Sequence, residues 1–329
     1  MDIGVSTAIS SDSVDVAVLA KKAESLGFES FWLPEHTIVP VHTNTKYAGT
    51  ADGSIPPSMA DMGDPLIGLA RASAVTEKIK LGTAISLVPE HNPLIQAKQI
   101  ATLDRLSNGR FIFGIGAGWL AEETEIMGGD FEHRWGQTRE AILAMKELWT
   151  KDEAEFHGRY YDFPLVKSSP KPVQKPHPPV FLGGYAPNVF KRVAAWGDGW
   201  MPIRVTPEQV KMGRAAIDEL AEVAGRDPKS IRVMVCSVPP ERDTIMRLEE
   251  AGADRVALSL PRDMGDKVLT ELEAMAEQSQ RMAEGKLQEL RFGLIGYVSH
   301  ECGICLISTT EPRYTRNHRP NSFSRLSIA

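Results

Sequence analysis

The sequence contains few cysteines and no long apolar run. Its 329 residues include only Cys236, Cys302 and Cys305, too few for the disulfide framework of a small secreted protein. No uninterrupted apolar stretch approaches the ~20 residues that a membrane span requires. The N-terminus has neither the basic nor the apolar region of a secretory signal peptide. We therefore expect a cytoplasmic protein that does not enter the membrane.

The sequence also has no excess of basic residues. The 37 lysines and arginines are outnumbered by 43 aspartates and glutamates, which gives a formal net charge of −6. An acidic protein has no general attraction for nucleic acid backbones or anionic lipids, so we expect neither as a partner. Hydrophobic residues make up 42% of the chain and charged residues 24%, as in soluble globular proteins with a packed core.

Short β-rich segments alternate with longer segments of helical periodicity. This alternation indicates a parallel sheet with helical crossovers, and eight strands favour a (β/α)8 TIM barrel over an open doubly wound sheet. The expected strands are Ile3–Ser6, Phe31–Leu33, Ile79–Ser86, Arg110–Ile115, Val180–Leu182, Trp200–Met201, Ile231–Cys236 and Arg255–Leu260. The expected helices are Val14–Leu26, Asn92–Leu106, Thr138–Trp149, Asn188–Trp196, Pro207–Ala224, Glu241–Ala251 and Gly265–Met282.

Two insertions and a tail depart from a minimal barrel. Residues 37–64, after the second strand, lack periodicity, and long loops of this kind are usually functional. Before the fifth strand, the β-like Phe156–Phe163 and the proline-rich Pro164–Pro179 predict an inserted hairpin and linker. We expect residues 1–285 to form the barrel domain. Residues 286–329, with six basic against three acidic residues, are expected to be an unstructured extension, and the Cys302–Cys305 spacing is only half of a zinc site.

The C-terminal ends of the expected strands, where barrel enzymes place their chemistry, hold few reactive side chains. No lysine is present for a Schiff base, and Glu35 is the one carboxylate where a glycosidase needs two. His36 has no partner pattern for a metal site. A cofactor would therefore supply the chemistry.

Two glycine clusters indicate where a cofactor would bind. Gly114, Gly116 and Gly118 end the fourth strand, and Gly183 and Gly184 end the fifth. Glycines allow close approach of the backbone and expose N–H groups to a phosphate or a flat ring. The helix that begins near Asn188 offers further unpaired N–H groups to an anion. Tight packing of the barrel strands is the alternative explanation of the first cluster.

Four segments, in one consistent order, carry a family resemblance. They are Leu26–His36 (LGFESFWLPEH), Leu81–Ser86 (LGTAIS), Ala101–Phe111 (ATLDRLSNGRF) and Gly197–Trp200 (GDGW). Over about residues 1–283 the chain resembles the luciferase-like monooxygenase superfamily, and within it the actinobacterial F420-dependent oxidoreductases. The resemblance implies a barrel with the cofactor ring at its mouth and a histidine close to the ring. It also implies a non-prolyl cis peptide after the third strand and cofactor-phosphate contacts from the later glycine loops.

Residue by residue, the resemblance assigns His36 to the histidine near the ring, with Glu35 beside it. We predict His36 as the proton donor or acceptor and Glu35 as a second catalytic residue, which alternatively only orients His36. The cis peptide is expected between Ala84 and Ile85. The residues expected to contact the cofactor are Ala84, Ile85, Ser86, Gly116, Gly118, Trp119, Gly183 and Gly184.

Some residues depart from the family pattern or have a structural alternative. Trp119 stands where F420-dependent sugar-phosphate dehydrogenases have a catalytic glutamate, so sugar-phosphate oxidation is not expected. His36 is alternatively a hydrogen-bonded barrel histidine. Arg134 and Arg139 are expected at a helix start, away from the glycine loops, in ion pairs with helix carboxylates.

The predicted function is hydride transfer between coenzyme F420 and a small organic substrate. An FMN-dependent monooxygenase that uses reduced flavin and O2 is the first alternative, because it would use the same barrel and nearly the same residues. A non-catalytic flavin-binding partner subunit is the second. We expect a homodimer, and a separate flavin or F420 reductase as a partner protein. The sequence of the long loop does not identify the substrate.

Overall fold

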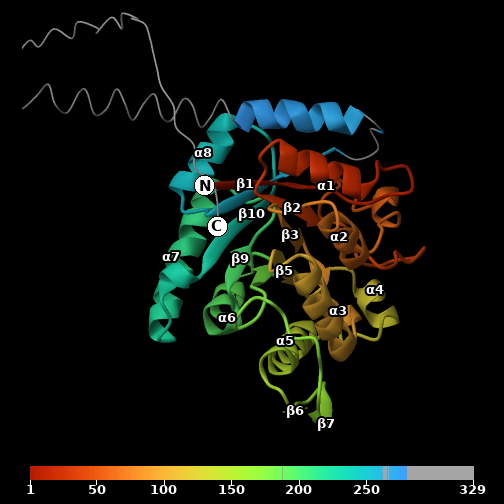
Figure 1. Cartoon of the computed structure of the whole chain (residues 1–329), viewed down its shortest axis with the longest axis vertical. Helices are drawn as coiled ribbons and strands as arrows, with labels where there is room; N and C mark the ends of the chain where they lie inside the picture. Colours follow the sequence, from red (N-terminus) through yellow and green to blue (C-terminus); the bar gives the residue numbers. More distant parts are fainter. Residues whose placement is uncertain (187, 262–264, 266, 280–329) are drawn as a thin grey trace, which may run out of the picture. The chain divides into compact units, whose positions relative to one another are not determined.

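A computed structural model of the protein describes residues 1–186, 188–261, 265 and 267–279. Eight parallel strands form a closed barrel with helices between them, which confirms the predicted TIM barrel (Figure 1). The barrel strands are β1 (Asp2–Ser6), β2 (Ser30–Leu33), β3 (Lys80–Thr83), β5 (Phe111–Gly116), β8 (Val180–Gly183), β9 (Gly199–Met201), β10 (Arg232–Val238) and β11 (Arg255–Ser259). Pairing of β1 with β11 and of β3 with β5 closes the circle.

Helices follow the strands around the barrel (Figure 1). They are α1 (Val16–Ser25), α2 (Pro65–Ser73), α3 (Pro93–Leu106), α4 (Ala121–Ile126), α5 (Arg134–Thr150), α6 (Asn188–Trp196), α7 (Pro207–Val223), α8 (Arg242–Glu250) and a helix over 267–279. Several begin with a polar cap followed by proline, as Asn92 and Pro93 begin α3. The cap oxygen satisfies free N–H groups of the first turn, and proline needs no hydrogen-bond acceptor there.

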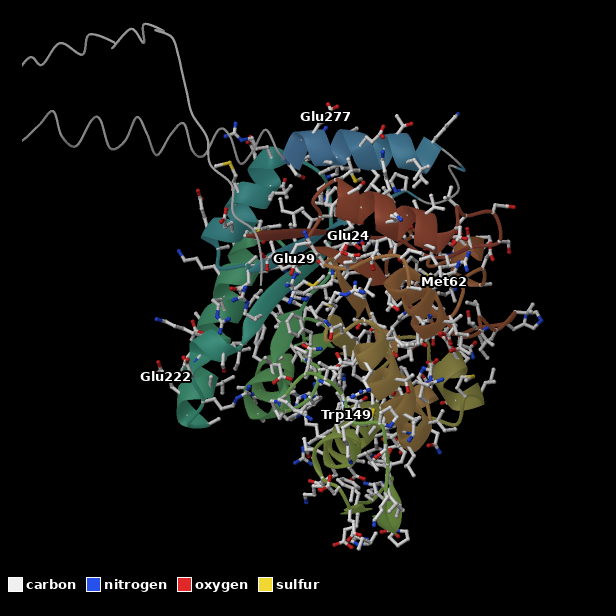
Figure 2. The ribbon with its side chains drawn as sticks, in the orientation of Figure 1. Glu24, Glu29, Met62, Trp149, Glu222 and Glu277 are labelled. Atoms are coloured by element: carbon white, nitrogen blue, oxygen red, sulfur yellow. The ribbon has the colours of Figure 1, made fainter. Side chains whose placement is uncertain are left out.

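The core lies between the strands and the helices. All the barrel strands except β1 are buried along most of their length, as in parallel sheets covered on both faces. Trp149 of α5, labelled in Figure 2, is 1% exposed and donates its indole N–H to the Ala97 carbonyl of α3 at 2.9 Å. This contact satisfies the one polar atom of a large buried side chain and fixes α5 on α3.

The third strand and three helices differ from the sequence prediction. The strand expected over Ile79–Ser86 divides into β3 and β4 (Ser86–Leu87), and β4 pairs with β5. The prediction missed α2 and α4, which have nine and six residues. Asp64 caps α2 through the Ile67 N–H, a signal that was present in the sequence next to Pro65. α5 begins at Arg134, four residues before the predicted start.

Both insertions are present. After β2 the chain runs to α2 through a loop that contains only the short 3-10 helix η1 (Pro57–Met59). Before β8, the strands β6 (Ala154–His157) and β7 (Asp162–Val166) form the predicted antiparallel hairpin with shifted ends.

The barrel belongs to a compact unit, Met1–Met282. The expected boundary at residue 285 and the Cys302–Cys305 pair lie outside the described residues, so both stay predictions. No helix in the described part of the chain is long and apolar enough to span a membrane.

Candidate active site

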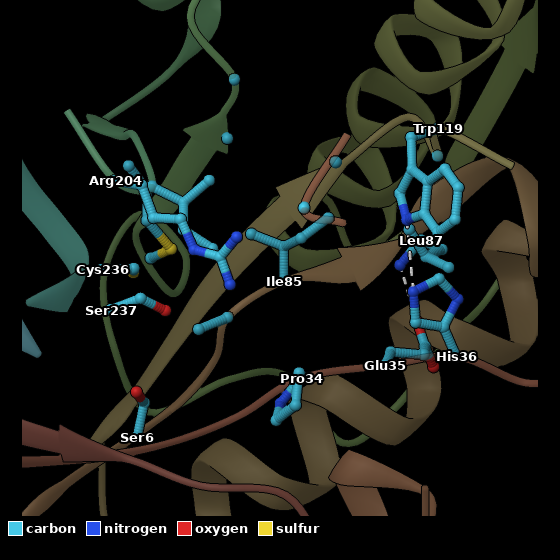
Figure 3. Close-up of a pocket in the computed structure, with 18 of the residues that line it drawn as sticks. Ser6, Pro34, Glu35, His36, Ile85, Leu87, Trp119, Arg204, Cys236 and Ser237 are labelled. Carbon is cyan, nitrogen blue, oxygen red and sulfur yellow. Dashed lines mark hydrogen bonds between the residues drawn. The ribbon is translucent and has the colours of Figure 1, made fainter. Parts of the chain in front are cut away.

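A cavity of about 880 Å³ opens at the C-terminal ends of the barrel strands. The predicted residues Glu35, His36, Ala84, Ile85, Gly116, Gly118, Trp119, Gly183 and Gly184 all line it (Figure 3). Ser86, also predicted as a cofactor contact, does not line the cavity. It is fully buried, and its hydroxyl donates to Glu35 at 2.8 Å. All the predicted site residues except Ser86 therefore line one cavity, and Ser86 lies behind its surface.

His36 is held by hydrogen bonds at both ring nitrogens. Its Nδ1 lies 2.7 Å from Glu123 Oε2. Trp119 donates its indole N–H to the other nitrogen, His36 Nε2, at 3.3 Å (Figure 3). Since an indole N–H only donates, Nε2 accepts, and the neutral imidazole carries its proton on Nδ1. The nitrogen paired with Trp119 is therefore the one with a lone pair available to a substrate that displaces the indole.

The alternative role expected for Glu35, that it only orients His36, is wrong. The carboxylate of Glu35 accepts from the Ser86 hydroxyl and the Leu87 N–H and lies 3.0 Å from His91 Nε2. Adjacent residues of an extended chain point to opposite sides, which directs the two side chains to different partners. Burial opposes ionisation of Glu35, but the hydrogen bond and charge of His91, together with the hydrogen bonds of Leu87 and Ser86, outweigh it and lower the pKa of Glu35.

Glu123, on the short helix α4, is the true partner of His36. It is 1% exposed, and its second oxygen accepts the backbone N–H groups of Thr37 and Ile38 at 3.0 and 3.3 Å. One carboxylate thus fixes both the histidine and the start of the long loop. The Glu122–Glu123 pair was visible after the first glycine cluster, but no sequence spacing connects it with His36.

A third carboxyl group, that of Glu90, lies close to the Glu35–His91 and Glu123–His36 pairs. Glu90, at the end of the 3-10 helix η2 (Val88–Glu90), is 5% exposed. Its Oε1 accepts from the Thr124 hydroxyl at 3.3 Å, and its Oε2 has no hydrogen-bond partner among the described residues. Burial, then the charges of Glu123 and Glu35, raise the pKa of Glu90 to about 8. Glu90 is therefore protonated at neutral pH.

Ile85 forms the floor of the cavity. The Ala84–Ile85 peptide bond is cis, as the resemblance implied. A methyl group at Gly116 would overlap the Ile85 Cδ1 atom, and one at Gly183 would lie 3.2 Å from Ile85 Cγ2. Packing against Ile85 thus accounts for two of the predicted cofactor-binding glycines without a cofactor.

The other two glycines lie near arginines. Gly118 and Gly184 have φ values of +82° and +105°, which glycine adopts without steric cost. Arg134 donates to the Gly118 carbonyl at 3.1 Å, and Arg192 of α6 lies 4.5 Å from the centre of the Trp135 ring. The expectation that Arg134 lies away from the glycine loops is therefore wrong.

These two arginines are also electrostatically coupled. Burial, and then the charge of Arg134, lower the pKa of Arg192. Two guanidinium groups close enough to repel each other are better tolerated when an anion lies between or beside them. Arg192 lines the cavity, so this end of it suits an anionic group such as a phosphate.

The long loop 37–64 forms the outer wall of the cavity. Glu122 of α4 accepts the backbone N–H groups of Asn44 and Thr45, the latter at 3.1 Å. Tyr47 then packs on Trp119 with ring centres 5.2 Å apart. Met59 and Met62 of the same loop add apolar surface. The wall is aromatic and apolar, which suits an organic substrate.

Comparison with known sequences gives the family context of this site. Residues 4–311 match the family model described as luciferase-like monooxygenase. An uncharacterised protein of Mycobacterium tuberculosis is 36% identical over 282 residues, which cover 84% of this chain and 98% of that protein. An F420-dependent glucose-6-phosphate dehydrogenase of Amycolatopsis mediterranei is 31% identical, and an FMNH2-dependent dimethylsulfone monooxygenase of Pseudomonas putida is 30% identical. Each of these two alignments covers 57% of this chain and 52% of the relative.

Solved structures agree on the fold. A monooxygenase from Streptomyces bottropensis superposes with a TM-score of 0.70 at 19% identity. An F420-dependent secondary alcohol dehydrogenase, in complex with an F420–acetone adduct, superposes with a TM-score of 0.65 at 20% identity. Both comparisons cover 84% of this chain and 98% of the other. At these identities the likeness concerns the barrel alone.

Proposed function

Because this chain belongs to the luciferase-like monooxygenase family, whose relatives use F420 or FMN, we propose that it transfers a hydride between F420 and a small organic substrate. The observation that carries the proposal is the Glu123–His36 pair, whose histidine lines the cavity. Dehydrogenation of an alcohol releases a proton together with the hydride, so a positioned base is needed. His36 Nε2 is that base.

The residues present fit a deazaflavin or flavin. Ile85 offers an apolar floor for a flat ring, and Trp119 closes one side. Arg192 at the positive-φ glycines offers a charge-assisted contact to a phosphate. When bound, the deazaflavin supplies the hydride acceptor or donor. Trp119 and Tyr47 shield the space beside His36 from water.

The proton path follows from the hydrogen bonds of His36. A substrate hydroxyl takes the place of the Trp119 indole at Nε2 and donates its hydrogen bond there. As the hydride leaves the carbon, Nε2 accepts the proton, and Glu123 stabilises the imidazolium through Nδ1. In the reverse direction His36 returns the proton to a carbonyl oxygen. Glu35, held by Ser86 and His91, does not contact His36.

An FMN-dependent monooxygenase remains the second candidate, supported by the relative from Pseudomonas putida at nearly the same identity as the F420-dependent one. Binding separates the two. The purified protein is titrated with F420 and with FMN, each oxidised and reduced, and binding is followed by fluorescence quenching. Micromolar or tighter binding of F420, with weak binding of FMN, supports the proposal. The reverse order supports the monooxygenase, and binding of neither contradicts both.

We further propose that the protein is a cytoplasmic homodimer. Exposed apolar side chains on the contacting helices α2 and α3, such as Ile67 at 73% and Ile95 at 61%, support a buried surface between two copies. Light scattering coupled to gel filtration measures the mass. A monomer at micromolar concentration contradicts the proposal.

A further inference from the structure

Arg204 lines the cavity just beyond the end of β9. Its backbone N–H donates to the Cys236 carbonyl of β10 at 3.4 Å, and its φ is +53°. Ser237, in the neighbouring strand, has a φ of +55° and also lines the cavity. Left-handed backbone at non-glycine residues is uncommon and is often found at ligand sites. Arg204 and Ser237 thus reach the cavity from backbone conformations that are unfavourable for residues other than glycine.

The Arg204 guanidinium has no ion-pair or hydrogen-bond partner among the residues that the structure describes. Within that same part of the chain, Glu35 is the one carboxylate that lines the cavity. Its oxygens are already bonded to Ser86, Leu87 and His91. The positive charge of Arg204 therefore has no internal counter-charge in the cavity.

Arg204 comes from a different part of the barrel than the arginine proposed for the cofactor phosphate. Arg192 stacks on Trp135 beside Gly184, whereas Arg204 lies at β9 and β10. In the view of Figure 3, Ile85 lies between Arg204 and the His36–Trp119 pair. A substrate that lies on the face of a ring placed over Ile85 would thus have the base at one end and the free cation at the other.

The charge at this end suits a monoanion. The guanidinium of Arg204 is joined there by the hydroxyl-bearing side chains of Ser6, Ser237 and Ser259, which also line the cavity. A carboxylate is planar, carries one charge and matches the guanidinium with two parallel hydrogen bonds. A phosphate dianion would leave charge uncompensated with a single cation.

We propose that Arg204 binds a carboxylate of the substrate, so that the protein acts on small organic hydroxy or oxo acids. This inference rests on the proposed function and names its substrate class. In the oxidative direction the carbon–hydrogen bond breaks and its electron pair leaves with the hydride to oxidised F420. The hydroxyl proton passes to His36 Nε2, and a carbon–oxygen double bond forms. The carboxylate held by Arg204 is unchanged.

Matched pairs of acids and amides test the proposal by binding. Benzoate and lactate, and their uncharged counterparts benzamide and lactamide, are titrated into the full-length protein with and without F420, and tryptophan fluorescence is measured. Trp119 and Trp135 line the cavity, so this signal does not depend on the cofactor. We expect at least one acid to bind about tenfold or more tightly than its amide. If neither does, the carboxylate assignment is wrong.

Three variants test whether Arg204 causes the preference for the acid over the amide. Arg204→Met should abolish the preference for the acid, and Arg204→Lys should retain part of it. Arg247→Met, which removes a surface arginine paired with Glu208, removes the same charge far from the cavity and should change nothing. Thermal melting checks that each variant is folded. An unchanged preference in Arg204→Met overturns the proposal.

Binding of F420 and of inorganic phosphate shows whether Arg204 binds an anion other than a substrate carboxylate. If Arg204→Met weakens F420 binding as much as acid binding, Arg204 belongs to the cofactor site and the substrate assignment is wrong. If inorganic phosphate binds through Arg204 more tightly than either acid, the carboxylate class is wrong. Failure of both F420 and FMN to bind would refute the proposed function instead, while the titrations without cofactor still decide the role of Arg204.

Discussion

Replacing Glu90 by glutamine should stabilise the protein, and the gain should grow with pH. Glutamine has nearly the same shape as the protonated glutamic acid but never ionises. The pKa of Glu90 is raised from 4.5 to about 8, first by burial and then by Glu123 and Glu35. In the unfolded chain the carboxyl ionises near pH 4.5, whereas in the folded chain it keeps its proton until about pH 8.

The sign of the effect follows from proton linkage. Between these two pH values the folded state holds one proton more than the unfolded state, so the free energy of unfolding falls as pH rises. At about 1.4 kcal/mol per pH unit, the full difference amounts to roughly 4–5 kcal/mol. Local relaxation and water penetration around a buried carboxylate reduce this figure. We expect about 2 kcal/mol at pH 8 and about zero near pH 4.5.

Urea denaturation of the two proteins, at several values between pH 4.5 and 9, measures this difference. A gain of about 2 kcal/mol corresponds to a rise in melting temperature of about 4 °C or more for a domain of this size. Glu125→Gln, on the exposed side of α4, is the matched control and should show no pH-dependent gain. If wild type is more stable than Glu90→Gln at pH 8, or the difference does not vary with pH, Glu90 is not a buried protonated acid.

The remaining predictions concern the residues around His36. His36→Ala should lower turnover about 10²–10⁴-fold, the usual worth of acid–base catalysis, with a much smaller change in F420 affinity; full turnover would make the histidine structural. Trp119→Phe should raise kcat/KM by up to about tenfold, since the substrate hydroxyl no longer competes with the indole N–H, and a loss comparable to that of His36→Ala would refute the proton path. Glu123→Gln should lower turnover and speed proteolysis within residues 37–64, because the loop N–H groups lose a charged acceptor. Unchanged proteolysis would show that Glu123 does not hold the loop in place. Gly116→Ala should destabilise the protein by about 1–3 kcal/mol in urea through overlap with Ile85, and the double variant with Ile85→Ala should recover part of the loss.

Much of the barrel was predictable because its signals are local. The Asn92–Pro93 start of α3 is a cap and a proline adjacent in sequence, and the buried run Phe111–Gly116 is β5 itself. The short helix α4 has no side-chain cap and only six residues, so its sequence carries little signal. It is nevertheless the element that brings Glu122 and Glu123 to the long loop.

His36 lies in the cavity because of its place at a strand end, whereas Glu35, the neighbour suggested to orient it, has other partners. A residue directly after β2 lies at the mouth of any parallel barrel, so one strand assignment places the histidine in the cavity. Its partner Glu123 comes from 87 residues further along the chain, and neighbouring strand ends converge only after the barrel has closed. Glu35 is adjacent in sequence, yet the alternation of the extended chain directs it to Ser86 and His91. Adjacency therefore predicts which residues share a strand end, whereas closure of the barrel decides which of them are joined by hydrogen bonds.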